Sequence, residues 1–385
     1  MSYLIENYDR FPYTFVKGKG CNLFDDNGKH YLDFTSGISV VNLGHCNSDI
    51  TNILSEQAST LIHTSNLFIN YEQETLASVL SGLTNGGYSF FCNSGAEANE
   101  AAIKLARAYG NKKYDGLRYK IVTMENSFHG RTYATLSATG QKKVKHGFEP
   151  VADFFVHVPY NDFDAFYEVA QQNSVVAVMI ELIQGEGGVV EANKAYIERL
   201  VSYCNQSDII VICDEVQTGM GRTGAFICSK HYNIEPDIIT MAKAMGNGLP
   251  IGAMIAKEKL ISYFPMGSHG STFGGNHLVC KVAKAVVEKV SEQSFLDDVC
   301  KKGKYLTKKL HDILETKATV RGCGLMIGVA FNDIDAKEFT KKAMNEGLLL
   351  IPSAQNCVRV YPPLIVSIDE IDEATEIFEK VLRSF

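Results

Sequence analysis

The sequence predicts an α/β protein with a mainly parallel central sheet, helices on both faces of that sheet and a smaller α+β domain. Between about residues 45 and 270, short β-branched runs alternate with helix-like segments, and this alternation is typical of parallel sheets. After about residue 275, long helical segments surround a single strand. The chain has 385 residues, 45% of them apolar, which is enough for a large core and two domains.

The first 44 residues predict a hairpin with a return strand. Strand-like pieces at 14–16 and 21–24 precede an Asp-Asp-Asn-Gly turn at 25–28, and a third piece follows at 31–34. We expect residues 1–44 to join residues 275–385 in the small domain, and residues 45–274 to form the large domain. In the last part, helices are predicted at 281–291, 296–315 and 369–383, with a strand at 324–331.

The central elements place charged residues at strand ends. A helix is predicted from Ala96 to Tyr109, closed by Gly110, and strands are predicted at 120–124, 175–180, 209–213 and 238–241. Asp214 follows the third of these strands and Lys243 closely follows the fourth. Ligands of open α/β sheets bind at the carboxyl ends of the strands. An acid and a lysine there suggest a covalently held, positively charged ring, and pyridoxal phosphate is the candidate.

Composition excludes several classes of protein. The net charge of −7 and the lack of a Lys/Arg block argue against a nucleic-acid partner. The ten cysteines never form a Cys-x-x-Cys pair, so we expect neither a metal site nor a disulfide framework. No apolar signal region begins the chain, and no apolar run approaches the roughly 20 residues of a membrane span. We therefore expect a cytoplasmic protein with no membrane partner.

Two glycine-containing segments suit a phosphate. Asn93-Ser94-Gly95-Ala96 follows the strand-like piece 88–92 and opens a helix, whose free N–H groups and dipole favour an anion. An ordinary serine-capped helix is the alternative. Residues 270–276, which include Ser271 and Thr272, offer further hydroxyls and backbone donors.

Two loops carry an aromatic residue and charges. In the loop 127–132, Phe128 could stack on a planar cofactor and Arg131 could bind a carboxylate; a core aromatic and a surface charge are the alternatives. The turn 184–188 has three glycines and projects Glu186, although it could be a tight turn with an incidental acid. Arg359 lies in a short strand before Pro-Pro; it could be a surface charge or, near Glu186, could bind a dicarboxylate.

Asp214 and Lys243 carry the most specific chemistry. A carboxylate held against a pyridine nitrogen keeps that nitrogen protonated, which makes the ring an electron sink. A lysine at the next strand end can bond covalently to the cofactor aldehyde and then move protons. The alternative is a structural Asp–Lys ion pair, which is a weak stability device when buried.

Taken together, these motifs resemble the class III pyridoxal-phosphate aminotransferases. The likeness runs from Phe11-Pro12 to Arg359, and its longest motifs span residues 93–107 and 127–141. The resemblance implies a fold-type I homodimer with the active site at the subunit boundary. It implies that Lys243 is the Schiff-base lysine and that Asp214 pairs with the ring nitrogen. Phe128 and Val216 would contact the two faces of the ring, and Gln217 would reach its phenolic oxygen. The phosphate would be held by Ser94, Gly95, Ala96 and, from the other subunit, Thr272.

The resemblance also implies how substrates bind. Arg131 would hold the donor carboxylate, with Ser271 nearby, and Glu186 would screen Arg359 until 2-oxoglutarate binds. Ile38 stands where ornithine-specific relatives of this family carry a tyrosine, and an apolar residue favours a donor that is acylated or has no α-amine. The sequence departs from the family pattern at Asn47-Ser48, where a His-Pro pair is usual, and at Ala244–Asn247, which weakens any inference about donor choice.

We therefore expect transfer of the δ-amino group of N2-acetyl-L-ornithine to 2-oxoglutarate, giving N-acetyl-L-glutamate 5-semialdehyde and L-glutamate, a step of arginine biosynthesis. Ornithine, succinylornithine and 4-aminobutyrate are alternative donors within the family. An aminomutase and a non-catalytic pyridoxal-phosphate-binding protein are the alternatives from other classes. The pairing of Glu186 with Arg359 favours two-substrate chemistry over the aminomutase, and a non-catalytic protein would not need Lys243, Arg131 and Arg359 together.

Overall fold

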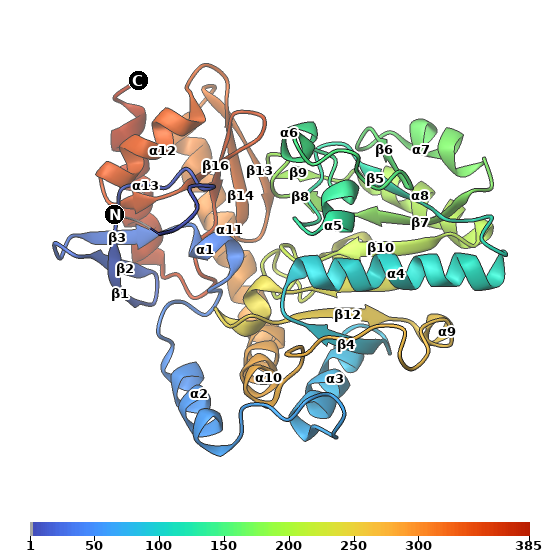
Figure 1. The fold of residues 1–385 in the computed structure, drawn as a ribbon. Coiled ribbons are helices and arrows are strands. Elements are labelled where there is room, and N and C mark those ends of the chain that lie inside the picture. The colour runs from blue at the N-terminus through green and yellow to red at the C-terminus, as the bar shows by residue number, and fades with distance from the viewer. Residues whose placement is uncertain (1–2) are drawn as a thin grey trace.

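The computed structural model describes residues 3–385. Figure 1 shows two lobes: the larger surrounds a central sheet, and the other combines the two ends of the chain, coloured blue and red. The two lobes meet beside α1 (Ser36–Ser39) and the turn that precedes β12 (Gly252–Ala256).

Within the described residues, the central sheet has seven strands in the order β4, β12, β11, β10, β7, β5, β6. The neighbouring strands from β11 to β6 are parallel, whereas β12 is antiparallel to both of its neighbours. The predicted α/β class with a mainly parallel sheet is confirmed, and the antiparallel β12 was not predicted. The other strands are β4 (Tyr88–Cys92), β5 (Lys120–Met124), β6 (Phe155–Val158), β7 (Val175–Ile180), β10 (Ile210–Asp214) and β11 (Ile238–Met241).

Strand β10 illustrates why the sheet is covered on both faces. Ile210 and Ile212 pack with residues of α4 (Gly95–Lys113) on one face. The alternate residues Val211 and Cys213 pack with α7 (Phe163–Ala170) and α8 (Lys194–Ser207) on the other. Successive side chains of a strand point to opposite faces, so a continuous apolar run is buried on both sides. Each such side chain stabilises the fold by about 1.5–3 kcal/mol.

The predicted end of α4 at Gly110 is wrong. The helix continues to Lys113, and Gly110 lies inside it. A Cβ at Gly110 would lie 2.0 Å from the carbonyl oxygen of Arg118. This glycine therefore allows the chain that leaves the helix to pass close to it, which periodicity alone does not distinguish from a helix stop.

At the β4 end of the sheet, α10 (His277–Ser291) packs against α2 (Ser48–Thr60) and α3 (Tyr71–Leu83). Their apolar residues share one cluster with strands β4, β11 and β12. Helix α10 thus packs on the large sheet, although the sequence places the start of the small domain at about residue 275. That boundary stays a prediction.

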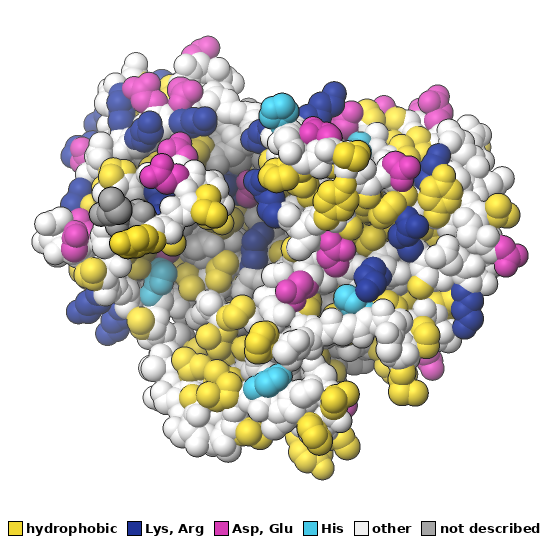
Figure 2. All heavy atoms as spheres, in the orientation of Figure 1, with side chains coloured by type: hydrophobic (Ala, Val, Ile, Leu, Met, Phe, Trp, Pro, Cys, Tyr) yellow, Lys and Arg dark blue, Asp and Glu magenta, His cyan; other side chains and the backbone are white. Residues whose placement is uncertain are grey.

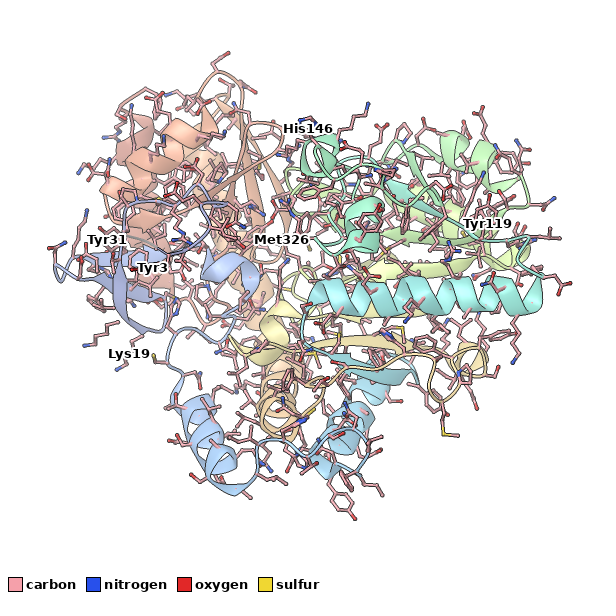
Figure 3. All side chains as sticks on the ribbon, in the orientation of Figure 1. Tyr3, Lys19, Tyr31, Tyr119, His146 and Met326 are labelled. Carbon is pink, nitrogen blue, oxygen red and sulfur yellow. The ribbon has the colours of Figure 1, made fainter. Side chains whose placement is uncertain are left out.

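The second lobe joins residues from both ends of the chain. Leu32 and Phe34 share a cluster with Leu306, Phe339 and Phe378. Met326, labelled in Figure 3, lies where this lobe meets the large one, and it packs with the α7–α8 side of the central sheet. The elements are β1 (Phe15–Lys19), β2 (Asn22–Asp25), β3 (His30–Asp33), α11 (Gln293–Leu314), β13 (Ala318–Cys323), β14 (Met326–Phe331), α12 (Ala336–Asn345), β15 (Leu348–Leu349), β16 (Ile351–Ser353), β17 (Cys357–Val360) and α13 (Ile368–Leu382).

The hairpin with a return strand is confirmed, since β1 pairs with β2 and β2 with β3. The predicted strand 324–331 begins at Met326, and its partner β13 was not predicted. Short elements complete the chain: α5 (Tyr133–Ala138), α6 (Lys142–Lys145), β8 (Ile183–Gln184), β9 (Val190–Glu191), η1 (Cys228–Tyr232), η2 (Lys243–Gly246) and α9 (Glu258–Ile261).

Candidate active site

A pocket of about 250 Å³ lies at the carboxyl ends of β10 and β11. It collects side chains from α4, from the loop after β5, from the end of β7 and from η2. The residues that line it are Gly95, Ala96, Asn99, Phe128, His129, Gly130, Arg131, Glu181, Glu186, Asp214, Val216, Gln217 and Lys243. The structure therefore brings together nine of the residues that the sequence singled out.

Asp214 is held by three donors. Its Oδ2 accepts a hydrogen bond from Asn99 Nδ2 at 2.8 Å and lies 2.8 Å from His129 Nδ1, while its Oδ1 accepts from the Val216 N–H at 3.1 Å. These bonds fix the carboxylate although it is almost completely buried, since buried charges need such partners. Sequence reasoning missed Asn99 and His129, although both lie inside the motifs that contain Ser94 and Phe128.

Lys243 is half-buried at the start of η2, with φ of 44°. Burial lowers the pKa of its ammonium group, and the negative charges of Glu186, Asp214 and Glu181 partly oppose this shift. Among the ion pairs of residues 3–385, none joins Lys243 to Asp214. The structure therefore does not contain the Asp–Lys ion pair that the sequence left open as an alternative.

Glu181 is a second buried acid in the pocket, and the sequence gave it no role. Its Oε2 accepts a hydrogen bond from the Phe128 N–H at 2.9 Å. Burial raises the pKa of this carboxyl to about 7, and the nearby His129 lowers it in part. It stands at the end of β7, so the same rule that singled out Asp214 would have found it.

At the other end of the pocket, Arg359 of β17 forms an ion pair with Glu186 of the β8–β9 turn. The Arg359 side chain is 3% exposed and that of Glu186 is 30% exposed. Arg359 also donates to the carbonyl of Pro352 at 3.3 Å, but its Nε has no acceptor among the described residues. The predicted proximity of these two residues is thus present, with the carboxylate as the more accessible partner.

Close packing of glycines shapes the pocket wall. A Cβ at Gly95 would lie 2.6 Å from Val216 Cγ1, and a Cβ at Gly185 would lie 1.7 Å from Gln217 Oε1. That same Gln217 oxygen accepts a hydrogen bond from Tyr361 at 3.3 Å. Larger residues at the two glycines would displace Val216 and Gln217, and so would narrow the pocket.

Four predicted residues and Arg359 are not among the lining residues of the pocket. Ser94 caps α4 by accepting from the Glu97 N–H at 3.2 Å, as the alternative interpretation expected. Ser271 Oγ accepts from Asn93 Nδ2 at 3.1 Å, and Thr272 is exposed in a wider hollow of about 1290 Å³. Ile38 is half-buried in α1 with φ of 65°, which is rare for a β-branched residue.

Cationic side chains gather near the junction of the two lobes. Figure 2 shows a recess there, with dark blue Lys and Arg side chains along one wall. In the described part of the chain, no group of three or more His, Cys, Asp or Glu side chains is arranged to hold a metal ion, and all ten cysteines are free. No helix of residues 3–385 is long and apolar enough to cross a membrane.

The chain belongs to the class-III aminotransferases, whose family model matches residues 3–382, and it is a transaminase. It is 48% identical to the acetylornithine aminotransferase of Caldanaerobacter subterraneus subsp. tengcongensis over 383 residues, which are 99% of this chain and 97% of the relative.

Two solved structures share the fold. The ornithine aminotransferase of Toxoplasma gondii, in which PLP partially occupies the active site, has a TM-score of 0.94, 30% identity and coverage of 99% of this chain and 92% of that one. The acetylornithine aminotransferase of Elizabethkingia anophelis has a TM-score of 0.88 and 31% identity, with coverage of 100% and 97%. The aminotransferase fold is therefore shared along almost the whole chain.

Proposed function

We propose that this transaminase moves the δ-amino group of N2-acetyl-L-ornithine to 2-oxoglutarate, giving N-acetyl-L-glutamate 5-semialdehyde and L-glutamate in arginine biosynthesis. The observation that carries the proposal is the buried Arg359, held by the accessible carboxylate of Glu186 at the edge of the Asp214–Lys243 pocket. An arginine that one movable carboxylate screens can serve two substrates of different charge. The 48% identity to an acetylornithine aminotransferase supports the choice of donor.

The pocket fits pyridoxal 5′-phosphate. Asp214, fixed by its three donors, would face the pyridine nitrogen, and Phe128 and Val216 would contact the two faces of the ring. Gln217 would reach the phenolic oxygen, while Ser94, Gly95 and Ala96 at the start of α4 would hold the phosphate. Gly95 fits this role because any Cβ there would collide with Val216. When bound, the cofactor supplies an aldehyde that bonds to amines and an electron-withdrawing ring.

Lys243 would hold and move the proton. Burial lowers its pKa, so its amine loses a proton more readily than an exposed lysine would. With the cofactor bound, the neutral amine of Lys243 would be the group that takes a proton from the substrate carbon and returns it. The negative charges of Glu181, Glu186 and Asp214 raise the pKa of Lys243 in part, so the amine can still take up a proton.

Two arginines would divide the substrate carboxylates. Arg131 is exposed at the pocket rim, with its guanidinium carbon 5.7 Å from the centre of the Phe128 ring, so it could bind the donor carboxylate, with Ser271 nearby. Arg359 would stay paired with Glu186 during this first half-reaction. In the second, Glu186 would move and Arg359 would bind the carboxylate of 2-oxoglutarate.

We propose a cytoplasmic homodimer with a shared active site. Thr272 lies outside the pocket of its own chain, on a face where Leu67, Met266 and Phe273 are exposed. Large exposed apolar residues in one region are typical of a subunit interface. A second copy seated there would carry its Thr272 toward the phosphate of the first copy.

Ornithine is the second candidate donor, because the ornithine aminotransferase of Toxoplasma gondii has a TM-score of 0.94 to this chain. The apolar Ile38 argues against it, since a free α-amine needs a polar partner. Succinylornithine and 4-aminobutyrate are further rivals.

The test is a panel of half-reactions with the purified holoenzyme. Acetylornithine should remove the visible absorbance of the bound cofactor, and 2-oxoglutarate should restore it. We expect the second-order rate constant of the half-reaction to be at least about tenfold higher with acetylornithine than with ornithine. A faster reaction with ornithine would identify ornithine as the donor in place of acetylornithine. The absence of a reaction with any ω-amine would refute the proposed function. Lys243→Ala should bind the cofactor without turnover, whereas normal activity would refute its role.

A further inference from the structure

Arg321 lies near the Glu186–Arg359 pair and has no role in the proposed function. It is directly opposite Gly328 of β14, and Gly328 is directly opposite Arg359 of β17. Opposed residues of antiparallel strands project to the same face of a sheet. Two arginines therefore flank one glycine on one face, with their Cα atoms about 10 Å apart at the usual strand spacing.

The turn that carries Glu186 covers this face. A Cβ at Gly328 would lie 2.7 Å from Val189 Cβ, so the turn presses directly on the sheet between the two arginines. A Cβ at Gly188 would lie 3.0 Å from Arg321 Nη2. The Arg321 guanidinium thus rests against the backbone two residues beyond Glu186.

Arg321 has donors without acceptors. Its Nε and Nη2 are buried and have no hydrogen-bond partner in the part of the chain that the structure describes. It lies beside the thiol of Cys357, whose pKa is raised mainly by burial and lowered in part by Arg321. A buried guanidinium is costly when its donors are unpaired. Two guanidinium groups, those of Arg321 and Arg359, therefore lie on one face of the sheet, and Glu186 is paired with Arg359.

Arg107 provides a contrast. It also has a buried nitrogen, Nη1, without an acceptor. Its guanidinium, however, lies 3.9 Å from the centre of the Phe154 ring, and this cation–π contact offsets the missing hydrogen bond. Neither the cation–π contacts nor the ion pairs of the described residues include Arg321, which leaves its charge uncompensated in this state of the turn.

We propose that Arg321 is a positioning residue that receives the Glu186 carboxylate when it leaves Arg359. The ion pair is exchanged, not lost: Glu186 passes from one guanidinium to the other, and Arg359 becomes free for a substrate carboxylate. The inference rests on the proposed function, in which Arg359 binds the keto acid. It predicts that Arg321 assists the dicarboxylate without touching it.

Calorimetric titration of the holoenzyme with glutarate, an unreactive dicarboxylate, tests this exchange. Arg321→Gln should raise the Kd of glutarate about tenfold, because Glu186 then has no second guanidinium to move to. In the Glu186→Gln background the same change should alter the Kd less than about twofold, because no carboxylate remains to be received. Arg321→Lys should recover part of the affinity, and the matched control Arg107→Gln should leave the Kd unchanged.

The outcomes separate the alternatives. An equal loss of affinity in both backgrounds would mean that Arg321 binds the dicarboxylate itself, and an unchanged Kd in Arg321→Gln would mean that it plays no part; both overturn the inference alone. Failure of the unsubstituted enzyme to bind glutarate overturns the proposed function together with it. If Arg321→Gln does not fold, a crystal structure of the glutarate complex decides: Glu186 bonded to Arg321 supports the exchange, and Glu186 elsewhere refutes it.

Discussion

The two ends of the pocket satisfy their charges differently. At the Asp214 end, three donors hold one carboxylate within about 3 Å. At the Glu186 end, donors outnumber acceptors: Arg359 Nε and two nitrogens of Arg321 are buried without partners in the described chain. A fully bonded group is fixed in one position, whereas an incompletely bonded group can change partners.

The difference fits what each end must do in transamination. The proposed partner of Asp214 keeps the same charge in both half-reactions, so a rigid carboxylate is an advantage. The Glu186 end must accept a donor without a distal acid and then a dicarboxylate, so its charge balance must change. Substitutions at the two ends should therefore affect the half-reactions differently.

The largest effect is expected from Asp214→Asn. The amide keeps the shape of the carboxylate but cannot stabilise a protonated ring nitrogen. Both half-reactions should slow to a similar extent, on the order of 10³-fold. Stopped-flow absorbance measures each half-reaction separately. A loss confined to one substrate would contradict the fixed role of this end.

Arg359→Gln should act on one half-reaction only. Losing a buried charged donor to a carboxylate should raise the KM for 2-oxoglutarate about 100-fold. The donor half-reaction should change less than about threefold, because Arg359 is screened by Glu186 at that stage. Arg199→Gln, an exposed arginine paired with Asp164, is the control. If Arg359→Gln slowed both half-reactions equally, the Glu186 end of the pocket would not differ from the Asp214 end in the proposed way.

Glu181→Gln should change the pH dependence of stability. Burial raises the pKa of Glu181 from 4.5 to about 7, so the folded protein favours its protonated form. The stability that this group contributes is present below pH 4.5 and is lost as pH rises through about 7. The neutral Gln variant should not show this loss, which amounts to on the order of 1–3 kcal/mol.

Urea unfolding at pH 5, 6, 7 and 8 measures that difference. The free energy of unfolding of the unsubstituted protein should fall, relative to the Gln variant, across this range. Parallel pH profiles of the two proteins would contradict the raised pKa, because they would show that Glu181 stays ionised across this pH range.

The smallest effect is expected from Ile38→Tyr. A hydroxyl near the donor could accept a hydrogen bond from the free α-amine of ornithine. The ratio of kcat/KM for ornithine to that for acetylornithine should rise about tenfold. Ile38→Val, which keeps an apolar side chain, is the control. An unchanged ratio would assign donor choice to other residues.

Much of the fold could be predicted from the sequence because its signals are local. The strands that end at Met124, Ile180 and Met241 are apolar runs with clear ends, and the structure contains each with the predicted bounds. Gly110 was misread because a glycine that ends a helix and one that allows a neighbouring chain to approach look alike in sequence. The antiparallel β12 was missed because strand direction depends on the path of the connection.

The candidate site divides in the same way. Asp214 and Lys243 could be predicted because Asp214 is the last residue of a buried strand and Lys243 lies two residues beyond the end of the next. Asn99 and His129 could not be assigned to Asp214, since they are 115 and 85 residues away along the chain. The roles given to all the site residues, Thr272 and Arg131 among them, stay predictions.

The sequence by itself determined the family, the sheet and the kind of chemistry, because β-branched runs and motifs beside strand ends are properties of short segments. The tertiary structure alone decided the surroundings of the charged groups. Three donors hold Asp214, Glu186 pairs with Arg359 beside the unpaired Arg321 nitrogens of the described chain, and burial raises the pKa of Glu181. Hydrogen bonds and burial act between atoms that are close in space. Only the folded chain brings those atoms together.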